Sequence, residues 1–385
     1  MTPVVASYDL APLAQIVLVG VLVAAGPLAW QWLRHRYARP AARLRALTVL
    51  ALFLTFDLVL FGAFTRLSDS GLGCPDWPGC YGSASPLGAR AEIGAAQGAM
   101  PSGPVTHGKA WVEMTHRYLA TGVGALITLL VVLSWIEARR RRAQVSPWWA
   151  TATWVWVCLQ GAFGALTVTM KLYPLIVTTH LLGGIGLLVL LAIQGQAYVH
   201  EPLALSRRLH AGVILVAVLA LLQIALGGWV STNYAVLACR DFPTCQGSWW
   251  PSMDFGHGFT LLRELGAGAG GGFLPFAALT AIHYVHRLAA YVVLAALALL
   301  AWRLHASGRP ELRRWALALG GVALWQLASG LGNVVFGWPL VAALAHTGGA
   351  AVLATLLAVL LTRAWQARAR VAFSALPEQP AGAAP

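Results

Sequence analysis

Nine apolar stretches, each long enough to cross a membrane as a helix, constrain this chain more than any other feature of its sequence. The hydrocarbon core of a bilayer requires about 20 residues of helix. Only 10% of the residues are charged, whereas soluble domains contain about 25%. The sequence therefore predicts an all-α polytopic membrane protein surrounded by lipid, with spans near residues 12–33, 46–66, 110–136, 148–170, 174–199, 210–231, 278–302, 314–337 and 340–362.

The basic residues give the chain a formal net charge of +13 and occur in alternate loops. Because Lys and Arg accumulate in cytoplasmic loops, we expect a bacterial inner (plasma) membrane protein with a periplasmic N-terminus and a cytoplasmic C-terminus. The charge forms no single patch, so no nucleic-acid partner is expected. The first ten residues lack a basic segment, which favours a first span over a signal peptide. The basic loops are Arg34–Arg45, Arg139–Arg142, Arg207–Arg208, Arg303–Arg314 and Arg363–Arg370.

An internal duplication relates the two halves of the chain, because matching residues recur at nearly constant offsets. The offset is 165 for Gly62 and Gly227, Cys74 and Cys239, and Cys80 and Cys245; 170 for His116 and His286; and 166 for Gln160 and Gln326, and His180 and His346. Spans two to five and six to nine then form two tandem four-helix bundles, a parallel repeat about an axis along the membrane normal. The first span lies outside this repeat.

The duplication predicts four parts of the chain. Residues 1–45 hold the extra N-terminal span and a basic cytoplasmic loop, residues 46–200 the first four-helix repeat, and residues 201–366 the second. The tail, residues 367–385, is rich in Ala and Pro and is expected to be disordered.

Two histidines in each half lie at matched depth on the outer side of their spans, and this pattern indicates a bound group. They are His116 and His180 in the first half, and His286 and His346 in the second. Intramembrane ionisable residues are costly and mark functional sites. Two imidazoles leave zinc or copper short of ligands, whereas a porphyrin supplies four nitrogens and needs only the axial pair. The sequence therefore predicts haem, with hydrogen-bonded packing as the alternative.

Glu113 makes the two halves unequal, because its counterpart in the second half is His283. It precedes His116 by three residues and shares its helix face, so it is a candidate for moving protons beside the site. The alternative is a carboxylate that orients the histidine or a loop amide. Arg117 and Arg287 follow histidines near the outer interface, and we expect them to pair with haem propionates; snorkelling towards the headgroups is the alternative.

Four of the five cysteines form two pairs in the loops that the topology places outside, where conditions are oxidising. Cys74 with Cys80 and Cys239 with Cys245 are each separated by five residues. A disulfide in each loop is predicted. A Cys-ligated metal is the alternative, but the pairs lack the short spacing of such sites. Cys158 lies alone in an apolar span.

The ordered set of these motifs resembles haem A synthase, the membrane enzyme of cytochrome oxidase assembly that hydroxylates haem O. The set comprises the run GAFTRLSDSGLGCPDWPGCYG at 62–82, the segments EMTHR and HYVHR, and the two later histidines. The resemblance covers about residues 46–366. It implies an oxidoreductase that converts one porphyrin methyl of haem O to a formyl group by successive hydroxylations, using oxygen derived from water and removing electrons.

The resemblance also implies a division of labour. The first half would take the substrate haem O between His116 and His180, with Glu113 near the reacting methyl. The second would hold a permanent cofactor, haem b, on His286 and His346. A haem O synthase in the same membrane is the expected supplier of substrate. The first span departs from the family's eight-helix core.

Two other functions explain four histidines. A di-haem electron carrier of the cytochrome b type would hold two permanent haems, and a haem transporter or chaperone would need no acid beside a ligand. Haem A in the extracted pigment favours the enzyme, and haem b alone favours the carrier. The electron acceptor is unknown from the sequence, and a homo-oligomer is left open.

Overall fold

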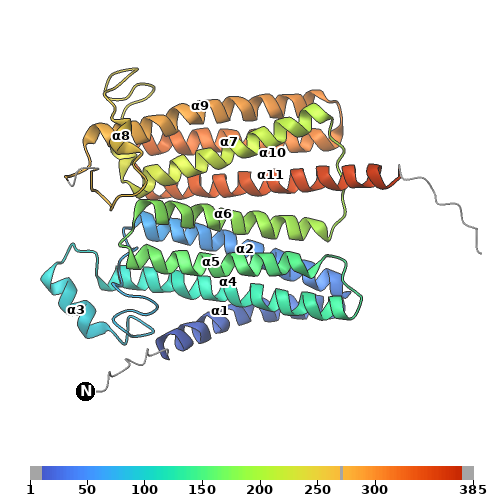
Figure 1. The fold of residues 1–385 in the computed structure, drawn as a ribbon, viewed down its shortest axis with the longest axis horizontal. Coiled ribbons are helices and arrows are strands. Elements are labelled where there is room, and N and C mark those ends of the chain that lie inside the picture. Colours follow the sequence, from blue (N-terminus) through green and yellow to red (C-terminus); the bar gives the residue numbers. More distant parts are fainter. Residues whose placement is uncertain (1–10, 269–271, 375–385) are drawn as a thin grey trace, which may run out of the picture.

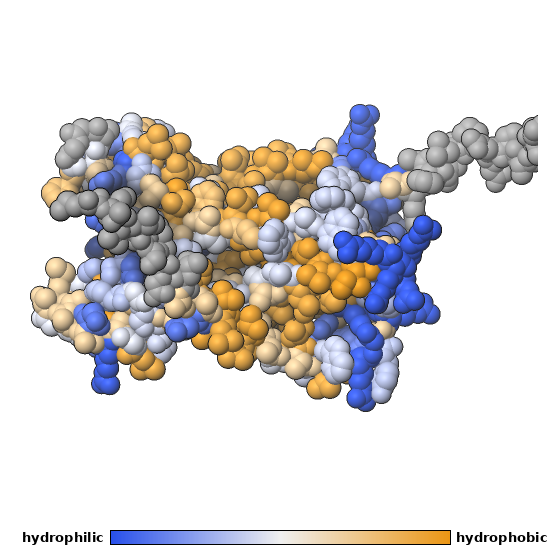
Figure 2. All heavy atoms as spheres, turned by 60° about the horizontal axis from the view of Figure 1, so that its bottom comes forward, coloured by the Kyte–Doolittle hydropathy of each residue, from blue (hydrophilic) through white to orange (hydrophobic). Residues whose placement is uncertain are grey.

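The computed structural model describes residues 11–268 and 272–374. Within these residues, nine helices are long and apolar enough to cross a membrane, as predicted. They run side by side in Figure 1, and an orange hydrophobic band separates the polar ends of the molecule in Figure 2. They are α1 (Ala11–His35), α2 (Pro40–Leu67), α4 (His107–Arg139), α5 (Pro147–Thr169), α6 (Pro174–Ala197), α7 (Arg207–Thr232), α9 (Phe276–Ala306), α10 (Pro310–Val335) and α11 (Leu340–Ser374).

Local sequence explains where most spans begin. Proline occupies the first turn of α2, α5, α6 and α10, where its fixed φ suits a helix and its missing N–H costs nothing. Ser206 and Thr106 cap α7 and α4, since their hydroxyls accept from the amides of Leu209 at 3.3 Å and Lys109 at 3.2 Å. The predicted tail begins inside α11, because that helix continues to Ser374. Residues 375–385 of the predicted tail lie outside the described part of the chain.

The helices form two four-membered groups. In the first, α2 and α5 each contact α4 and α6; in the second, α7 and α10 each contact α9 and α11. Figure 1 shows the first group below the second, with α1 against α4 at the lower edge. This matched order agrees with the predicted duplication, which rests on the sequence offsets and stays a prediction.

The groups meet through α6, α7, α11 and α2, and through polar contacts at the outer ends of α2 and α7. There Arg66 donates to the carbonyl oxygen of Ser231 at 2.6 Å, and its guanidinium lies 3.9 Å from the ring centroid of Tyr234. The Tyr234 hydroxyl donates to Asp69 at 2.8 Å, and Lys109 pairs with Asp69 at 3.2 Å. The two halves are therefore tied at their outer ends by hydrogen bonds as well as by apolar packing.

The long outer loops contain three short helices, α3 (Arg90–Ala99), η1 (Ala235–Leu237) and α8 (Phe255–Gly258). Each loop also contains one predicted disulfide, with Cα atoms 4.9 Å apart for Cys74–Cys80 and 4.8 Å for Cys239–Cys245. Both predicted pairings are confirmed. Each disulfide closes a small turn, and the two turns contact α4 and α9, the helices that contain His116 and His286.

An aspartate organises each disulfide turn. Asp241 accepts from the amides of Gln246 at 2.7 Å and Gly247 at 2.9 Å, and Asp76 accepts from those of Tyr81 and Gly82 in the first loop. A hydrogen bond from Thr244, together with these amides, lowers the pKa of Asp241 to about 2. Asp241 is therefore ionised at neutral pH and holds its turn as a charged acceptor.

Candidate functional site

One cavity of about 1320 Å³ extends through both halves of the protein. All four predicted histidines line it, as do Glu113, Arg117 and His283. The sequence-predicted residues are therefore brought together on one internal surface. Arg287 is the exception: it is buried beside the cavity but is not among the residues that line it.

In the first half, His116 and His180 both line the cavity. Each ring faces a glycine of a neighbouring helix. A Cβ added to Gly62 would lie 3.0 Å from Cε1 of His116, and one added to Gly164 would lie 3.5 Å from Cε1 of His180. The Phe61 ring lies nearly parallel to His116, with centroids 6.3 Å apart and an interplanar angle of 6°.

The second half repeats this arrangement with His286 and His346. A Cβ on Gly227 would lie 3.0 Å from Cε1 of His286, and one on Gly330 would lie 3.2 Å from Cε1 of His346. Both rings again line the cavity. Small residues thus let a neighbouring helix approach each of the four imidazoles closely.

The two halves differ in the partners of the histidine Nδ1 atoms. Nδ1 of both His116 and His180 is buried without a hydrogen-bond partner among the described residues. Nδ1 of His286 lies 3.0 Å from the amide nitrogen of Gln223, which also donates to the carbonyl oxygen of His286 at 3.1 Å. Nδ1 of His346 lies 3.0 Å from the Ser329 hydroxyl, and the amide of Gln326 also lies 3.0 Å from it.

These residues fit a haem in each half. All four rings line the cavity, and at His346 the Ser329 hydroxyl oxygen can accept from Nδ1–H, which leaves Nε2 of that ring to bind an axial position. Among the described residues, no group of three or more His, Cys, Asp or Glu side chains could hold a bare ion. A porphyrin completes such a set because it needs only two protein ligands.

Glu113 lies between the cavity and the first disulfide loop. Glu113 is buried, with only 4% of its surface exposed. One carboxylate oxygen accepts from the amide of Cys74 at 2.8 Å, and the other forms an ion pair with Arg117. Arg117 also donates to three backbone carbonyls of the loop, those of Asp76, Pro78 and Gly79. The loop-amide role considered as the alternative for Glu113 is therefore present, on a residue that also faces the cavity.

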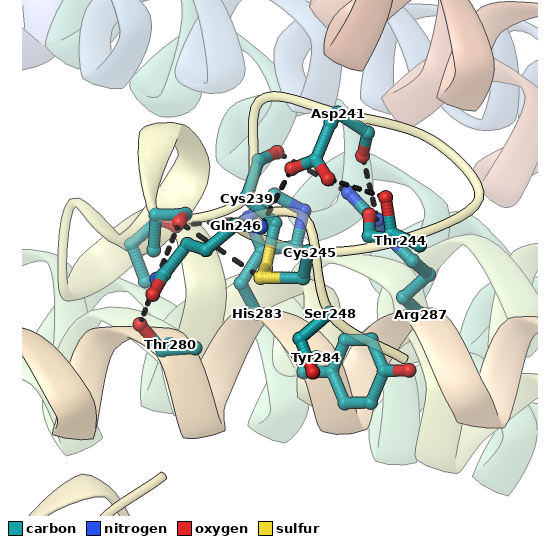
Figure 3. Close-up of a disulfide and its surroundings, with 12 residues drawn as sticks. Cys239, Asp241, Thr244, Cys245, Gln246, Ser248, Thr280, His283, Tyr284 and Arg287 are labelled. Carbon is teal, nitrogen blue, oxygen red and sulfur yellow. Dashed lines mark hydrogen bonds between the residues drawn. A yellow bond between two sulfur atoms is a disulfide. The ribbon is translucent and has the colours of Figure 1, made fainter. Parts of the chain in front are cut away.

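Arg287 holds the second disulfide loop in the same way, as Figure 3 shows. It donates to the carbonyl oxygens of Asp241 at 2.9 Å, Thr244 at 2.7 Å and Cys239 at 3.2 Å. His283, the counterpart of Glu113, lies 3.0 Å through Nδ1 from the carbonyl oxygen of Ala235. Both arginines thus bind loop backbone, and their pairing with haem propionates stays a prediction.

Sequence reasoning missed Gln223 and Ser329 as partners of the histidines. The structure places the Gln223 amide 3.0 Å from Nδ1 of His286, and the same amide donates to the backbone carbonyl oxygen of His286 at 3.1 Å. Gln223 lies one turn before Gly227 in an apolar part of α7. An amide at this position in the sequence indicates a polar partner at that depth in the membrane. Ser329 gives no such signal, because serine is common in membrane helices.

The fold and the cavity define a multi-pass membrane protein whose two pairs of histidines line one internal cavity. The chain belongs to the family of cytochrome oxidase assembly proteins, which it matches over residues 45–358. A heme A synthase of Shewanella oneidensis is 39% identical over 79% of this chain and 91% of its own length. Heme A synthases of Mesorhizobium japonicum and Caulobacter sp. are 30% and 29% identical over 83% and 88% of this chain, covering 90% and 98% of those proteins. Helix α1 lies outside the family match.

Proposed function

We propose that this protein is a haem A synthase, which oxidises a methyl group of haem O to the formyl group of haem A for cytochrome oxidase. One observation carries the proposal beyond the family match. Two histidine pairs share a single cavity, and a buried carboxylate, Glu113, faces that cavity beside only the first pair. A protein that holds two equivalent haems has no need of this asymmetry.

The substrate haem O is assigned to His116 and His180, and the cofactor haem b to His286 and His346. The different Nδ1 partners support this assignment. Polar side chains that contact the ring of a metal-ligating imidazole hold its orientation, and among the described residues only the second half supplies them at Nδ1. A haem b there would provide an electron sink within the cavity. No hydrogen bond at Nδ1 from the described part of the chain fixes the orientation of the first-half imidazoles.

Glu113 is proposed to accept protons from the reacting centre. Hydroxylation with oxygen derived from water releases protons as well as electrons, and a positioned carboxylate speeds such proton transfers. Arg117 and the amide of Cys74 fix the Glu113 side chain from the outer side. The carboxylate is therefore held in place at the outer end of the cavity, where protons can pass to the loops.

Pigment analysis tests the proposed function directly. The full chain is purified from cells with and without a co-expressed haem O synthase, and the extracted haems are separated chromatographically. We expect haem b in both preparations and haem A only in the preparation with co-expressed haem O synthase. Haem b alone in both, at two per chain, would contradict the proposal and identify an electron carrier; unchanged haem O would identify a carrier of that haem.

Replacing Gln223 by leucine tests the assignment of the resident haem. The substitution removes the amide that contacts Nδ1 of His286. Loss of a side chain that contacts a metal-ligating imidazole lowers metal affinity by about 10- to 100-fold. We expect haem b to transfer to apomyoglobin faster by a similar factor. Gln160→Leu is the matched control, because His180 Nδ1 receives no bond from Gln160. An unchanged transfer rate in Gln223→Leu would contradict the role.

The remaining features of the system are proposed on the same basis. The basic loops lie at the end of the molecule where α11 ends, as the hydrophilic cluster in Figure 2 shows, which supports a cytoplasmic C-terminus and a periplasmic N-terminus. A haem O synthase in the same membrane would supply the substrate. An electron acceptor is required because the reaction removes electrons, and assembly into a homo-oligomer is compatible with the fold.

A further inference from the structure

The cavity reaches much deeper into the membrane in the first half than a macrocycle on His116 and His180 requires. We propose that this extension is a groove for the prenyl side chain of haem O, and that Gly124 and Gly161 make the first half selective for the prenylated haem. The inference rests on the proposed function and names the part of the substrate that the site recognises. Haem b carries a vinyl group where haem O carries the prenyl chain.

The groove follows α4 inwards from His116. Its lining continues along this helix as far as Val132 and along α5 as far as Trp154. From His116 to Val132 is sixteen residues of helix, or about 24 Å at 1.5 Å per residue, which exceeds the length of an extended farnesyl chain. The lining is uncharged and almost wholly apolar, which suits a hydrocarbon chain. It consists of Val17, Val21, Ala25, Leu28, Thr121, Gly124, Ala125, Thr128, Leu129, Val132, Trp154, Val157, Cys158 and Gly161.

Two glycines provide the width of this groove. A Cβ added to Gly124 or to Gly161 would meet no heavy atom within 4 Å. Close helix packing therefore does not require glycine at either position, unlike at Gly62, where the added atom would lie 3.0 Å from His116. The space in front of Gly124 and Gly161 is open and belongs to the cavity.

The second half has larger side chains at the corresponding positions. The offset of 170 residues that relates His116 to His286 relates Gly124 to Leu294, and the offset of 166 that relates Gln160 to Gln326 relates Gly161 to Leu327. In that half the cavity lining ends at Leu297 on α9 and reaches no further inwards than Gln326 on α10. The second half thus has a site for a macrocycle without the groove.

Helix α1 forms the other wall of the groove. Val17, Val21, Ala25 and Leu28 line it, and α1 is held tightly against α4, because a Cβ on Gly20 would lie 2.6 Å from Cβ of Thr121. The groove stays open to lipid along part of its length, since Val21 of α1 and Val132 of α4 are 44% and 50% exposed. A prenyl chain could therefore enter sideways from the bilayer together with its macrocycle.

Binding titrations test the groove independently of turnover. The protein is prepared without haem O synthase, so that only haem b is available, and reconstituted in nanodiscs; haem O is then added and its binding followed spectroscopically. We expect Gly124→Leu and Gly161→Leu to weaken haem O binding by at least about tenfold through overlap with the chain. Gly124→Ala should bind haem O like the wild type, because a methyl group fits the open space. Resident haem b on His286 and His346 should be retained at the wild-type level in all these variants.

Two further variants separate this effect from general damage. Gly320→Leu on α10 also adds a side chain where a Cβ meets nothing within 4 Å, but outside the cavity lining, and should leave haem O binding unchanged. Val21→Trp narrows the groove from α1 without altering either bundle and should weaken haem O binding while resident haem b is retained. Wild-type haem O affinity in Gly124→Leu, Gly161→Leu and Val21→Trp would overturn the groove. Failure of the wild type to bind haem O at all would instead overturn the proposed function.

Discussion

Replacing Glu113 by glutamine will stop the conversion of haem O to haem A while both haem sites remain occupied. Glutamine keeps the size of the side chain and an oxygen that can accept from the Cys74 amide, but it cannot take up a proton at neutral pH. Loss of a positioned general base typically slows a reaction by about 10²- to 10⁴-fold. The measurement is haem extraction from the variant co-expressed with haem O synthase, where we expect haem O or its alcohol intermediate to accumulate.

The control for this variant addresses the second role of Glu113, which is to hold the disulfide loop. Asp76→Asn weakens the same loop, because Asp76 accepts from the amides of Tyr81 and Gly82, but it leaves the Glu113 carboxylate in the cavity. We expect Asp76→Asn to convert haem O. If both variants lose conversion to the same extent, Glu113 acts by anchoring the loop, and its assignment as a proton acceptor is wrong.

Replacing His286 by alanine will remove nearly all haem b from the purified protein, because one of its two axial ligands is lost. His346→Ala should have the same effect. The conversion of haem O should also stop, since the electrons released in the first half would have no sink within the protein. Pyridine haemochrome spectra of protein produced without haem O synthase measure the haem b content per chain.

The matched variant in the other half is His116→Ala. It should retain haem b at the wild-type level and fail to bind added haem O, because its lost ligand belongs to the substrate site. The converse pattern, with haem b kept in His286→Ala and lost in His116→Ala, would show that the two haems are assigned to the wrong halves.

The spans, the disulfides and the pairing of the histidines could be predicted because each leaves a local or periodic signal. An apolar run of about 20 residues is typical of a helix that crosses a membrane. The two cysteine pairs lie only six residues apart in the chain, and the repeat offsets matched His116 with His286 and His180 with His346. These inferences needed no knowledge of how the helices pack.

The partners of the site residues could not be predicted in the same way, because they depend on the path of loops and on helix contacts. The contacts of Arg117 with three loop carbonyls require the particular turn closed by Cys74 and Cys80. The contact of Gln223 with His286 joins residues 63 apart in the chain. Likewise, nothing in the sequence of α1 indicates that this helix packs against α4 and lines the groove together with it.

The contact between Arg66 and Ser231 bears on how such a chain could arise. These two positions differ by 165, as do Asp69 and Tyr234, so each residue touches its own counterpart in the predicted repeat. In a dimer of identical four-helix units, a residue on the two-fold axis meets itself, and Arg66 would face arginine while Asp69 faced aspartate. The side-chain bond between Tyr234 and Asp69 exists because the two positions hold different residues. On the predicted duplication, joining the units in one chain would let such pairs, and with them Glu113 and His283, become unlike.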